Sequence, residues 1–341
     1  MKKIKKRYVI ILLLMITVSL IGYWFYQNYN NQPVISLEQQ EIALPYNNVK
    51  MYRNVKYSNI EMSQMDILMP KKIKKGDKLP LIIWTHGGGF IAGDKHHKNP
   101  YLAQIAEKGF IVANMNYALA PNQKYPTPIK QQVLASRFLK KNKLNLPIDF
   151  KQVVIGGDSA GAQLASQFAA IQTNEELRSQ MKLPQSFKPN EIRAVVLFGG
   201  LFNMNTVRAT KFPRIELFMS SYTGEKQWEK HFKPIRQMNT TEQITKDYPP
   251  TFLTVGDADP FVSQNKEMVN ALKAKDIPVM TSFFDGSHHL KHQYQFHLDL
   301  PESKLTFKKV MMFLGHYTNQ SPYNHQGKEE NVESVVFKKK K

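Results

Sequence analysis

The sequence predicts an α/β protein in which helices flank a mostly parallel sheet, preceded by one transmembrane helix. Two observations carry the prediction of the sheet. Short apolar runs alternate with helical patterns from about residue 81 to residue 316, and the runs are continuous instead of alternating with polar residues. Continuous runs are typical of strands that are buried on both faces of a parallel sheet. Such sheets carry their functional groups at the carboxyl ends of the strands.

Apolar runs of four to six residues predict the strands, at 81–85, 110–115, 153–156, 194–198, 251–255 and 279–284. Helical patterns follow in the gaps and after the last run, at 101–108, 129–141, 160–173, 264–274 and 302–316. Alternating elements of this kind form one open sheet with right-handed crossovers. Two segments fit the alternation poorly. Residues 173–190 predict a polar connection, and residues 203–250, with scattered aromatic residues, predict either a cap over a site or a peripheral helical pair.

The N-terminal residues predict a membrane location. Five of the first seven residues are basic, and the next nineteen, 8–26, carry no charge. About 20 apolar residues cross a bilayer, and basic flanks stay in the cytoplasm. A cleaved signal peptide is the alternative, but bulky aromatic residues stand at 23–26, where a cleavage site would need small ones. We therefore expect a cytoplasmic flank at 1–7, a signal anchor at 8–26, an extracellular stalk at 27–50, a folded domain at 51–318 and a disordered basic tail at 319–341.

Composition excludes several classes of function. The chain of 341 residues has no cysteine, which excludes disulfides, thiolate metal sites and a cysteine nucleophile. Its formal net charge is +20, but nine positive charges lie in the first seven and last four residues. The others are spread as single lysines and pairs, without a basic stripe that alternates with aromatic residues, which argues against nucleic-acid binding. Attraction to an anionic envelope surface explains the excess better.

The segment Gly157-Asp158-Ser159-Ala160-Gly161 has the pattern of a nucleophile elbow. An apolar run precedes it and a small-residue helical pattern follows, so the context is strand, tight turn and helix. Glycines two residues to either side of the serine let the chain turn without Cβ clashes, and the hydroxyl is then exposed at the strand's carboxyl end. The helix N-terminus behind it favours developing negative charge. Ser159 is therefore the candidate nucleophile.

Three glycines follow the strand at 81–85, in His86-Gly87-Gly88-Gly89. Backbone N–H groups of glycines can point into a pocket without obstruction by side chains. With the N–H of Ala160, those of Gly87 and Gly88 are the candidate donors to a tetrahedral oxyanion. A phosphate-binding loop is the alternative, but the sequence has neither a P-loop nor a spaced G-x-G-x-x-G motif.

An acid and a base are expected after the last strands. Asp257 and Asp259 follow the strand at 251–255, and Asp259 is preferred because Pro260 fixes a turn behind it. Spacing alone does not choose the base among four histidines, although the order serine, aspartate, histidine is that of a serine hydrolase triad. A zinc site is the alternative, but no H-E-x-x-H motif or cysteine accompanies the histidines. The histidines are His288, His289, His292 and His297.

These motifs together resemble the hormone-sensitive-lipase-like branch of the α/β-hydrolase superfamily, as found in bacterial esterases. The matching pieces are H-G-G-G-F at 86–90, N-Y-A-L-A-P at 116–121 with Y-P at 125–126, G-D-S-A-G at 157–161 and D-P at 259–260. The resemblance implies an α/β-hydrolase fold, a nucleophile at Ser159, an acid at Asp259 and an oxyanion hole in the glycine loop. It favours Asp259 over Asp257.

For the base, the resemblance leaves two positions. The usual G-x-x-H-G-F pattern is met only in part at 286–290, which points to His289. A subgroup of similar membrane-anchored hydrolases carries L-P-H-E-Y-Q-F, which residues 290–296 resemble more closely, and this favours His292. The implied function is a serine carboxylesterase for short- to medium-chain acyl esters or acylated envelope material, without metal or cofactor. The alternatives are a serine peptidase and a catalytically silent envelope-binding protein on the same fold.

Overall fold

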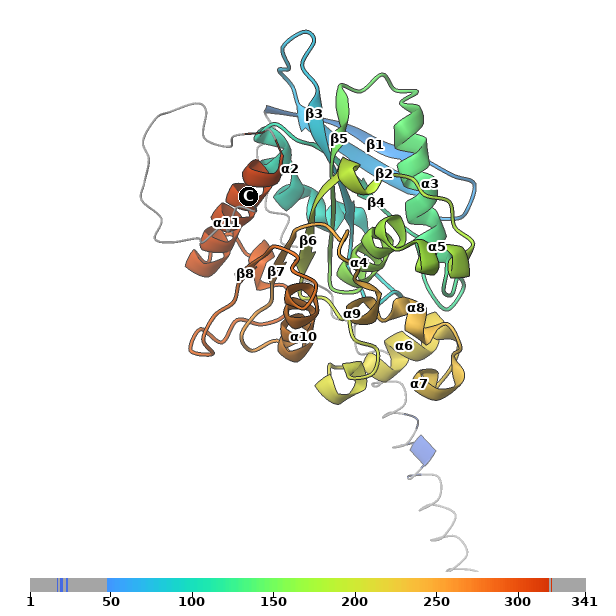
Figure 1. The fold of residues 1–341 in the computed structure, drawn as a ribbon. Coiled ribbons are helices and arrows are strands. Elements are labelled where there is room, and N and C mark those ends of the chain that lie inside the picture. Colours follow the sequence, from blue (N-terminus) through green and yellow to red (C-terminus); the bar gives the residue numbers. More distant parts are fainter. Residues whose placement is uncertain (1–16, 18, 21–22, 24–47, 319, 321–341) are drawn as a thin grey trace, which may run out of the picture. The chain divides into compact units, whose positions relative to one another are not determined.

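The computed structural model describes residues 17, 19–20, 23, 48–318 and 320. Within these residues eight strands form one sheet, in the order β1-β2-β4-β3-β5-β6-β7-β8 (Figure 1). The strands from β4 to β8 in this order pair in parallel, whereas β2 pairs antiparallel with both β1 and β4. The strands are β1 (Val49–Lys56), β2 (Gln64–Pro70), β3 (Leu79–Thr85), β4 (Ile111–Met115), β5 (Ile148–Asp158), β6 (Ile192–Phe198), β7 (Thr251–Thr254) and β8 (Val279–Ser282).

Helices cover both faces of this sheet. The core on one face includes residues of α3 (Thr127–Lys141), α4 (Ala160–Thr173) and α10 (Val262–Lys273). The core on the other face includes residues of α2 (Asn99–Glu107) and α11 (Pro301–Tyr317) (Figure 1). The predicted mostly parallel sheet with flanking helices is therefore confirmed.

Strand β3 shows why the central strands have continuous apolar sequences. Successive side chains of a strand point to opposite faces of the sheet. Leu81 and Ile83 pack in the core with α3 and α4. Ile82 and Trp84 pack in the core with α2 and α11. All four side chains are at most 1% exposed, so both faces of the strand demand apolar residues.

All six predicted strands and five predicted helices are present, with ends that differ by a few residues. Two strands at the antiparallel edge, β1 and β2, were not predicted. β1 has mostly exposed or half-buried residues, and β2 carries the buried Asp66 in its middle, so neither has the apolar run of a central strand. Because β1 starts at Val49, the last residues of the predicted stalk at 27–50 belong to the sheet.

The polar connection predicted at 173–190 is corrected by a helix, α5 (Glu175–Met181). The Asn174 side chain caps it by accepting from the N–H of Leu177, and acidic residues occupy its first turn, which complements the helix dipole. Leu177 is its one buried residue, so the segment lacks the apolar face that marks a helix in a sequence.

Short helices also occupy the segment at 203–250. These are η4 (Val207–Thr210), α6 (Ile215–Thr223), α7 (Trp228–His231), α8 (Ile235–Met238) and α9 (Thr240–Gln243). Arg208 holds three of them together, because it pairs with Glu216 and Glu229 and its guanidinium lies 3.7 Å from the ring centroid of Trp228. Elsewhere the chain forms η2 (Lys95–Lys98), η3 (Pro189–Glu191) and η5 (Tyr294–Phe296).

The predicted membrane segment at 8–26 lies almost entirely outside the described residues, which include only Thr17, Ser19, Leu20 and Tyr23 of it. Across the part of the chain that is described, no helix combines the length and the apolar character needed to cross a membrane. The predicted tail at 319–341 also falls outside the described residues, apart from residue 320.

Candidate active site

Ser159 lies at a sharp turn between β5 and α4. Its backbone has φ 54° and ψ −122°, a left-handed conformation that is costly for a residue with a side chain, and its N–H donates to the carbonyl of Phe198 at 2.7 Å. The flanking glycines are required by close packing. A Cβ on Gly157 would lie 2.3 Å from the Gly161 carbonyl oxygen, and one on Gly161 would lie 2.1 Å from that of Thr85. The local sequence therefore dictates the strained turn.

The structure brings Ser159, His292 and Asp259 into one hydrogen-bonded chain. His292 Nε2 lies 3.0 Å from Ser159 Oγ, and His292 Nδ1 lies 2.6 Å from Asp259 Oδ2. Asp259 is only 3% exposed, and its other oxygen accepts from the N–H of Phe261 at 2.9 Å. Both carboxylate oxygens therefore have partners, and the carboxylate is fixed beside the imidazole.

The other histidines lie elsewhere. His288 Nδ1 contacts Glu302 Oε1 at 2.9 Å. His289 is exposed and has a positive φ of 53°, in the turn before the loop reaches the site. His297 directly follows η5. Of the four histidines considered from sequence, His292 is the one within hydrogen-bond distance of Ser159.

Asp257 has a different place from Asp259. Its Oδ2 accepts from the N–H groups of Gly286 at 3.1 Å and His288 at 2.9 Å, and its Oδ1 accepts from that of Leu290 at 2.6 Å. Desolvation raises the pKa of Asp257, but these three backbone hydrogen bonds outweigh it and hold the pKa below its usual range. Asp257 therefore ties the loop that leads to His292.

The glycine loop requires one correction. The N–H of Gly87 does not face the site, because it donates to Asp158 Oδ2 at 3.0 Å. Gly89 lines the pocket next to Ser159, and Gly88 and Gly89 have positive φ values of 124° and 61°. Within the described residues, no acceptor is bonded to the N–H groups of Gly88, Gly89 or Ala160. Gly87 is therefore removed from the predicted set of oxyanion donors, Gly87, Gly88 and Ala160.

Asp158, next to the candidate nucleophile, carries a buried charge that binds the glycine loop to the turn. Its Oδ1 accepts from Trp84 Nε1 at 3.0 Å, and its Oδ2 lies 3.1 Å from Lys98 Nζ. The side chains of Lys98 and Asp158 are 5% and 1% exposed. A buried carboxylate needs such compensation. Sequence reasoning missed Lys98, because nothing around it marks it as buried.

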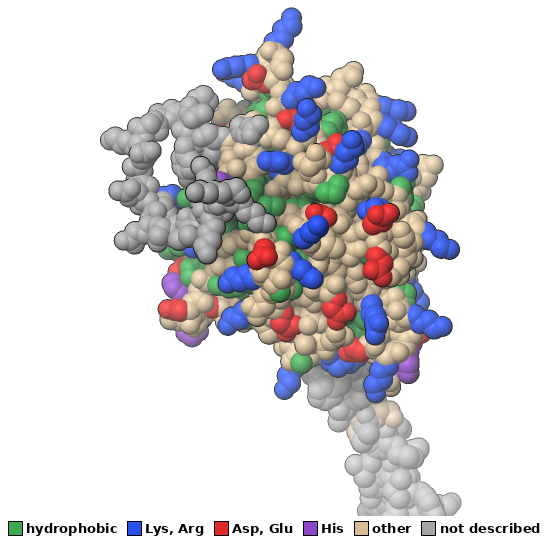
Figure 2. Space-filling view, viewed as in Figure 1, with side chains coloured by type: hydrophobic (Ala, Val, Ile, Leu, Met, Phe, Trp, Pro, Cys, Tyr) green, Lys and Arg blue, Asp and Glu red, His purple; other side chains and the backbone are tan. Residues whose placement is uncertain are grey.

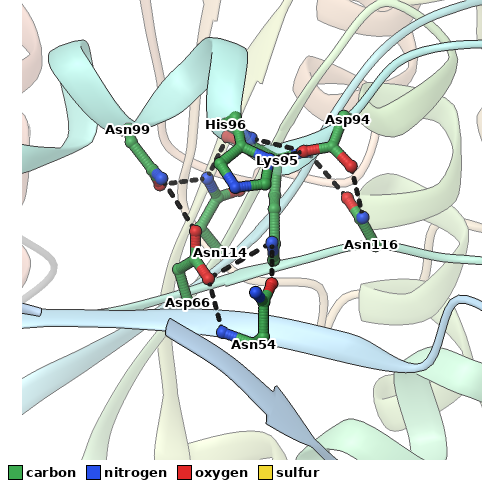
Figure 3. Close-up of polar contacts among 8 residues, drawn as sticks. All are labelled: Asn54, Asp66, Asp94, Lys95, His96, Asn99, Asn114 and Asn116. Atoms are coloured by element: carbon green, nitrogen blue, oxygen red, sulfur yellow. Dashed lines mark hydrogen bonds and ion pairs between the residues drawn. The ribbon is translucent and has the colours of Figure 1, made fainter. Parts of the chain in front are cut away.

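A second buried lysine, Lys95, begins η2, the short helix that ends at Lys98, and ties it to the edge of the sheet formed by β1 and β2 (Figure 3). Its Nζ lies 3.2 Å from Asp66 Oδ1 and donates to Asn54 Oδ1 at 2.8 Å, and its N–H donates to Asn116 Oδ1 at 2.7 Å. Figure 3 shows these side chains converging, with Asn54 from β1, Asp66 from β2, Lys95 from η2 and Asn116 from directly after β4. The two ends of η2 are therefore fixed by buried lysines, one toward the sheet edge and one toward the candidate nucleophile.

Asp94 and His86 complete the surroundings of the glycine loop. Burial raises the pKa of Asp94, but hydrogen bonds from the His96 backbone, Asn116 and the His96 side chain bring it down to about 2. Burial lowers the pKa of His86, which stacks on Tyr117 with ring centroids 4.5 Å apart. His86 is therefore a neutral packing residue beneath the loop.

A shallow apolar pocket opens beside Ser159, and the empty space in it, including space open to solvent, is about 220 Å³. Three of its lining residues, Phe212, Ile215 and Phe218, come from the segment at 203–250, so this segment contacts the site directly. The sequence offered only the scattered aromatic residues as a sign of this. The pocket is lined by Gly89, Phe90, Ser159, Ala160, Leu201, Phe212, Ile215, Phe218 and Phe261.

Comparison with known proteins identifies the family. Residues 65–273 match the BD-FAE family model, which is more than half of the chain. The chain belongs to the BD-FAE family. This BD-FAE protein is 22% identical to an acetyl esterase of Salmonella schwarzengrund over 224 residues, which cover 61% of the chain and 64% of that enzyme.

Solved structures share the fold of this BD-FAE protein. Esterase B from Lactobacillus rhamnosis superimposes with a TM-score of 0.72 at 22% identity, over 89% of this chain and 95% of that one. A bacterial heroin esterase gives a TM-score of 0.66 at 21% identity, over 81% and 86% of the two chains. The α/β-hydrolase fold is therefore shown. The predicted enzyme class, carboxylic ester hydrolase, agrees with the similarity to the acetyl esterase.

Proposed function

We propose that this BD-FAE protein hydrolyses esters of short acyl groups, with Ser159 as nucleophile, His292 as general base and Asp259 as the acid that orients it. The single observation that carries the proposal is the continuous contact from Ser159 Oγ through the imidazole to Asp259, with separations of 3.0 and 2.6 Å. Hydroxyl, imidazole and carboxylate in this order are the parts that acyl transfer through serine requires.

The steps follow from these contacts. Ser159 Oγ attacks the acyl carbon while its proton passes to His292 Nε2, and Asp259 accepts from Nδ1 and stabilises the imidazolium. The alcohol leaves with the proton from Nε2, and the acyl group stays on Ser159. Water then attacks the acyl-enzyme with His292 again as base, and the carboxylic acid is released. No cofactor takes part in this scheme.

The oxyanion of each tetrahedral intermediate would be held by the N–H groups of Gly88, Gly89 and Ala160. Two observations support this assignment. Within the described residues none of the three N–H groups is bonded to an acceptor, and Gly89 and Ala160 lie in the pocket wall beside Ser159. Each such donor contributes about 3 kcal/mol to stabilisation of the transition state. Gly87 would act indirectly, through its hydrogen bond to Asp158.

The pocket supports a short, uncharged acyl group as the substrate's acid part. Its volume of about 220 Å³ includes space open to solvent, and its lining is aromatic and aliphatic apart from Ser159 and the glycine. An apolar wall without a charged residue favours alkyl acyl chains over charged ones. We therefore propose acetyl to butyryl esters as the preferred class.

A membrane location remains part of the proposal, with the catalytic domain outside the cell. Its support is the sequence alone, namely the basic residues before an uncharged stretch at 8–26. Protease added to intact cells is expected to digest the catalytic domain and leave a cytoplasmic N-terminal tag intact. Protection of the whole chain in intact cells would refute this orientation.

The test of the esterase is hydrolysis of p-nitrophenyl acetate, butyrate and octanoate by the full chain in detergent. We expect turnover that prefers acetate and butyrate, and a fall of about 10⁴-fold or more in Ser159→Ala. Ser179, which is exposed on α5, supplies the matched control, and Ser179→Ala should keep normal turnover. Equal rates for the wild type and Ser159→Ala would refute the proposed mechanism.

A further inference from the structure

The loop between β2 and β3 is strongly basic. Five of the eight residues at 71–78 are lysines, all exposed, and Asp77 is the one acid among them. Within the described residues, none of these ammonium groups forms an ion pair with a carboxylate. The loop joins the sheet at the amino end of β3, where the backbone turns back from β2. The lysines are Lys71, Lys72, Lys74, Lys75 and Lys78.

A second basic loop lies against the first. Leu79 at the start of β3 donates its N–H to the Pro147 carbonyl at 2.8 Å and is in register with Ile148. Three more exposed lysines surround this junction, and Asp149 is the nearby acid, whose oxygens accept from the Lys151 N–H and from Gln152. Lys140 is excluded from the set, because it pairs with Glu191 at 2.8 Å. The three lysines are Lys141, Lys143 and Lys151.

These eight side chains form what we call the lysine patch, Lys71, Lys72, Lys74, Lys75, Lys78, Lys141, Lys143 and Lys151. Eight lysines and two aspartates, Asp77 and Asp149, leave six net positive charges. Figure 2 shows Lys and Arg side chains around the tip of the loop that stands at the top of Figure 1. Phe150, in β5, is the one aromatic residue at 71–78 or 141–151 and is half-buried, so the patch lacks the exposed rings on which nucleic-acid bases stack.

The first strand of the domain begins at this patch. The carbonyl of Asn48 accepts from the N–H of Lys71 at 2.9 Å, and Val49 is in register with Pro70. Asn48, where the continuous described range begins, therefore lies beside the basic loop. The chain before residue 48 contains the uncharged stretch at 8–26, which the sequence predicts to lie in a bilayer.

The candidate active site lies at the opposite edge of the sheet. Strand β5 runs from Ile148, beside the patch, to Asp158, beside Ser159. The ten steps between its 11 residues, at about 3.3 Å each, separate the two ends by roughly 33 Å. Figure 1 shows the β2–β3 loop at the top of the view and the helices α6 and α7 at the bottom.

We propose that the lysine patch docks on a bilayer surface rich in anionic phospholipid headgroups, so that the candidate active site faces away from the membrane. Lysine side chains are compact charges that attract an anionic surface without requiring a fixed geometry, and this attraction acts within about a Debye length of the surface. The proposal rests on the predicted membrane location and does not depend on the esterase activity.

The test compares lysine reactivity in nanodiscs of phosphatidylcholine alone and in nanodiscs with 30% phosphatidylglycerol. The full chain is reconstituted in both, acetylated briefly with an amine-reactive ester and examined by peptide mass spectrometry. We expect the patch lysines to react at least about threefold more slowly in the anionic discs, with the difference lost in 0.5 M salt because screening weakens the attraction. Three exposed lysines of the segment at 203–250 serve as internal controls and should react equally in both discs, Lys226, Lys230 and Lys233.

A matched pair of variants separates docking from general charge. The variant Lys71→Gln/Lys72→Gln/Lys74→Gln/Lys75→Gln should abolish the protection of Lys78, Lys143 and Lys151 and leave turnover of soluble esters unchanged. The control, Lys226→Gln/Lys230→Gln/Lys233→Gln/Lys246→Gln, removes the same number of exposed charges elsewhere and should keep the protection. Equal reactivity in both discs, failure of the chain to associate with either, or stronger protection by RNA in the absence of lipid would each overturn the proposal.

Discussion

Two regions of the candidate site, the nucleophile half around Ser159 and the histidine half around His292, are held in place in different ways. Ser159 stands on a strained turn whose neighbours are buried, with the ion pair of Asp158 and Lys98 beneath it. His292 follows an exposed loop that Asp257 holds by three backbone hydrogen bonds. The first half depends on compensation of buried charge and on tight packing. The second depends on hydrogen bonds near solvent, so damage to it should remain local.

The largest expected effect concerns the choice of base. His292→Ala should lower kcat/KM for p-nitrophenyl acetate by about 10³- to 10⁴-fold, because the proton of Ser159 then has no acceptor. His289→Ala, three residues away in the same exposed loop, is the matched control and should change it less than about threefold. Near-normal turnover of His292→Ala together with loss of activity in His289→Ala would exchange the roles of the two residues.

The difference between the two halves also explains what the sequence could predict. Five consecutive residues meet the requirements of the turn at Ser159. Their glycines avoid clashes with atoms that lie a few residues away in the chain or on the neighbouring strand. His292 lies 133 residues from Ser159, in a loop without a periodic pattern. Its position depends on how that loop closes over Asp257, and residue spacing does not encode this. Spacing alone therefore left four histidines open, and the resemblance to a known family was what favoured His292 over His289.

The errors have the same origin. Gly87 was assigned to the oxyanion hole, but its N–H is occupied by Asp158, whose direction is set by Lys98 and Trp84 from other elements. The central parallel strands were found because burial on both faces dictates an apolar composition. The edge strand β1 has mostly exposed or half-buried residues, and in β2 the buried Asp66, paired with Lys95, interrupts the apolar sequence. Long-range polar contacts leave no local pattern in a sequence.

The second prediction tests the buried charge of the nucleophile half. Lys98→Met removes the partner of a carboxylate that is 1% exposed, so it should destabilise the protein by about 3–5 kcal/mol. Lys140→Met breaks the partly exposed pair with Glu191 and should cost less than about 1 kcal/mol. Urea or thermal unfolding measures both. If the double variant Lys98→Met/Asp158→Asn is no more stable than Lys98→Met, the uncompensated charge of Asp158 is not the cause of the lost stability.

The third prediction tests the histidine half. Asp257→Asn keeps one acceptor but places an amide against backbone N–H groups, so the loop at 286–290 should loosen. We expect kcat to fall by about tenfold with KM unchanged, because the acyl pocket has no residue from this loop. Asp285→Asn is the control, because it alters an exposed carboxylate of the neighbouring turn whose hydrogen bonds, among the residues that the structure describes, go to Ser287. A rise in KM with unchanged kcat would show that Asp257 acts on substrate binding instead.

The smallest expected effect is a dependence on pH confined to the histidine half. Because the folded-state pKa of Asp257 lies below its usual range, the carboxylate contributes stability that is fully present above the unfolded pKa of about 3.9 and is lost as pH falls through the folded value. The stability difference between wild type and Asp257→Asn should therefore be constant from about pH 5 to 7 and shrink in more acidic solution. Thermal unfolding of both proteins, from pH 7 down to below the unfolded pKa, measures this difference in stability. A difference that grows on acidification would mean that the loop binds the protonated, uncharged form of Asp257 better than the carboxylate, contrary to the direction of its pKa shift.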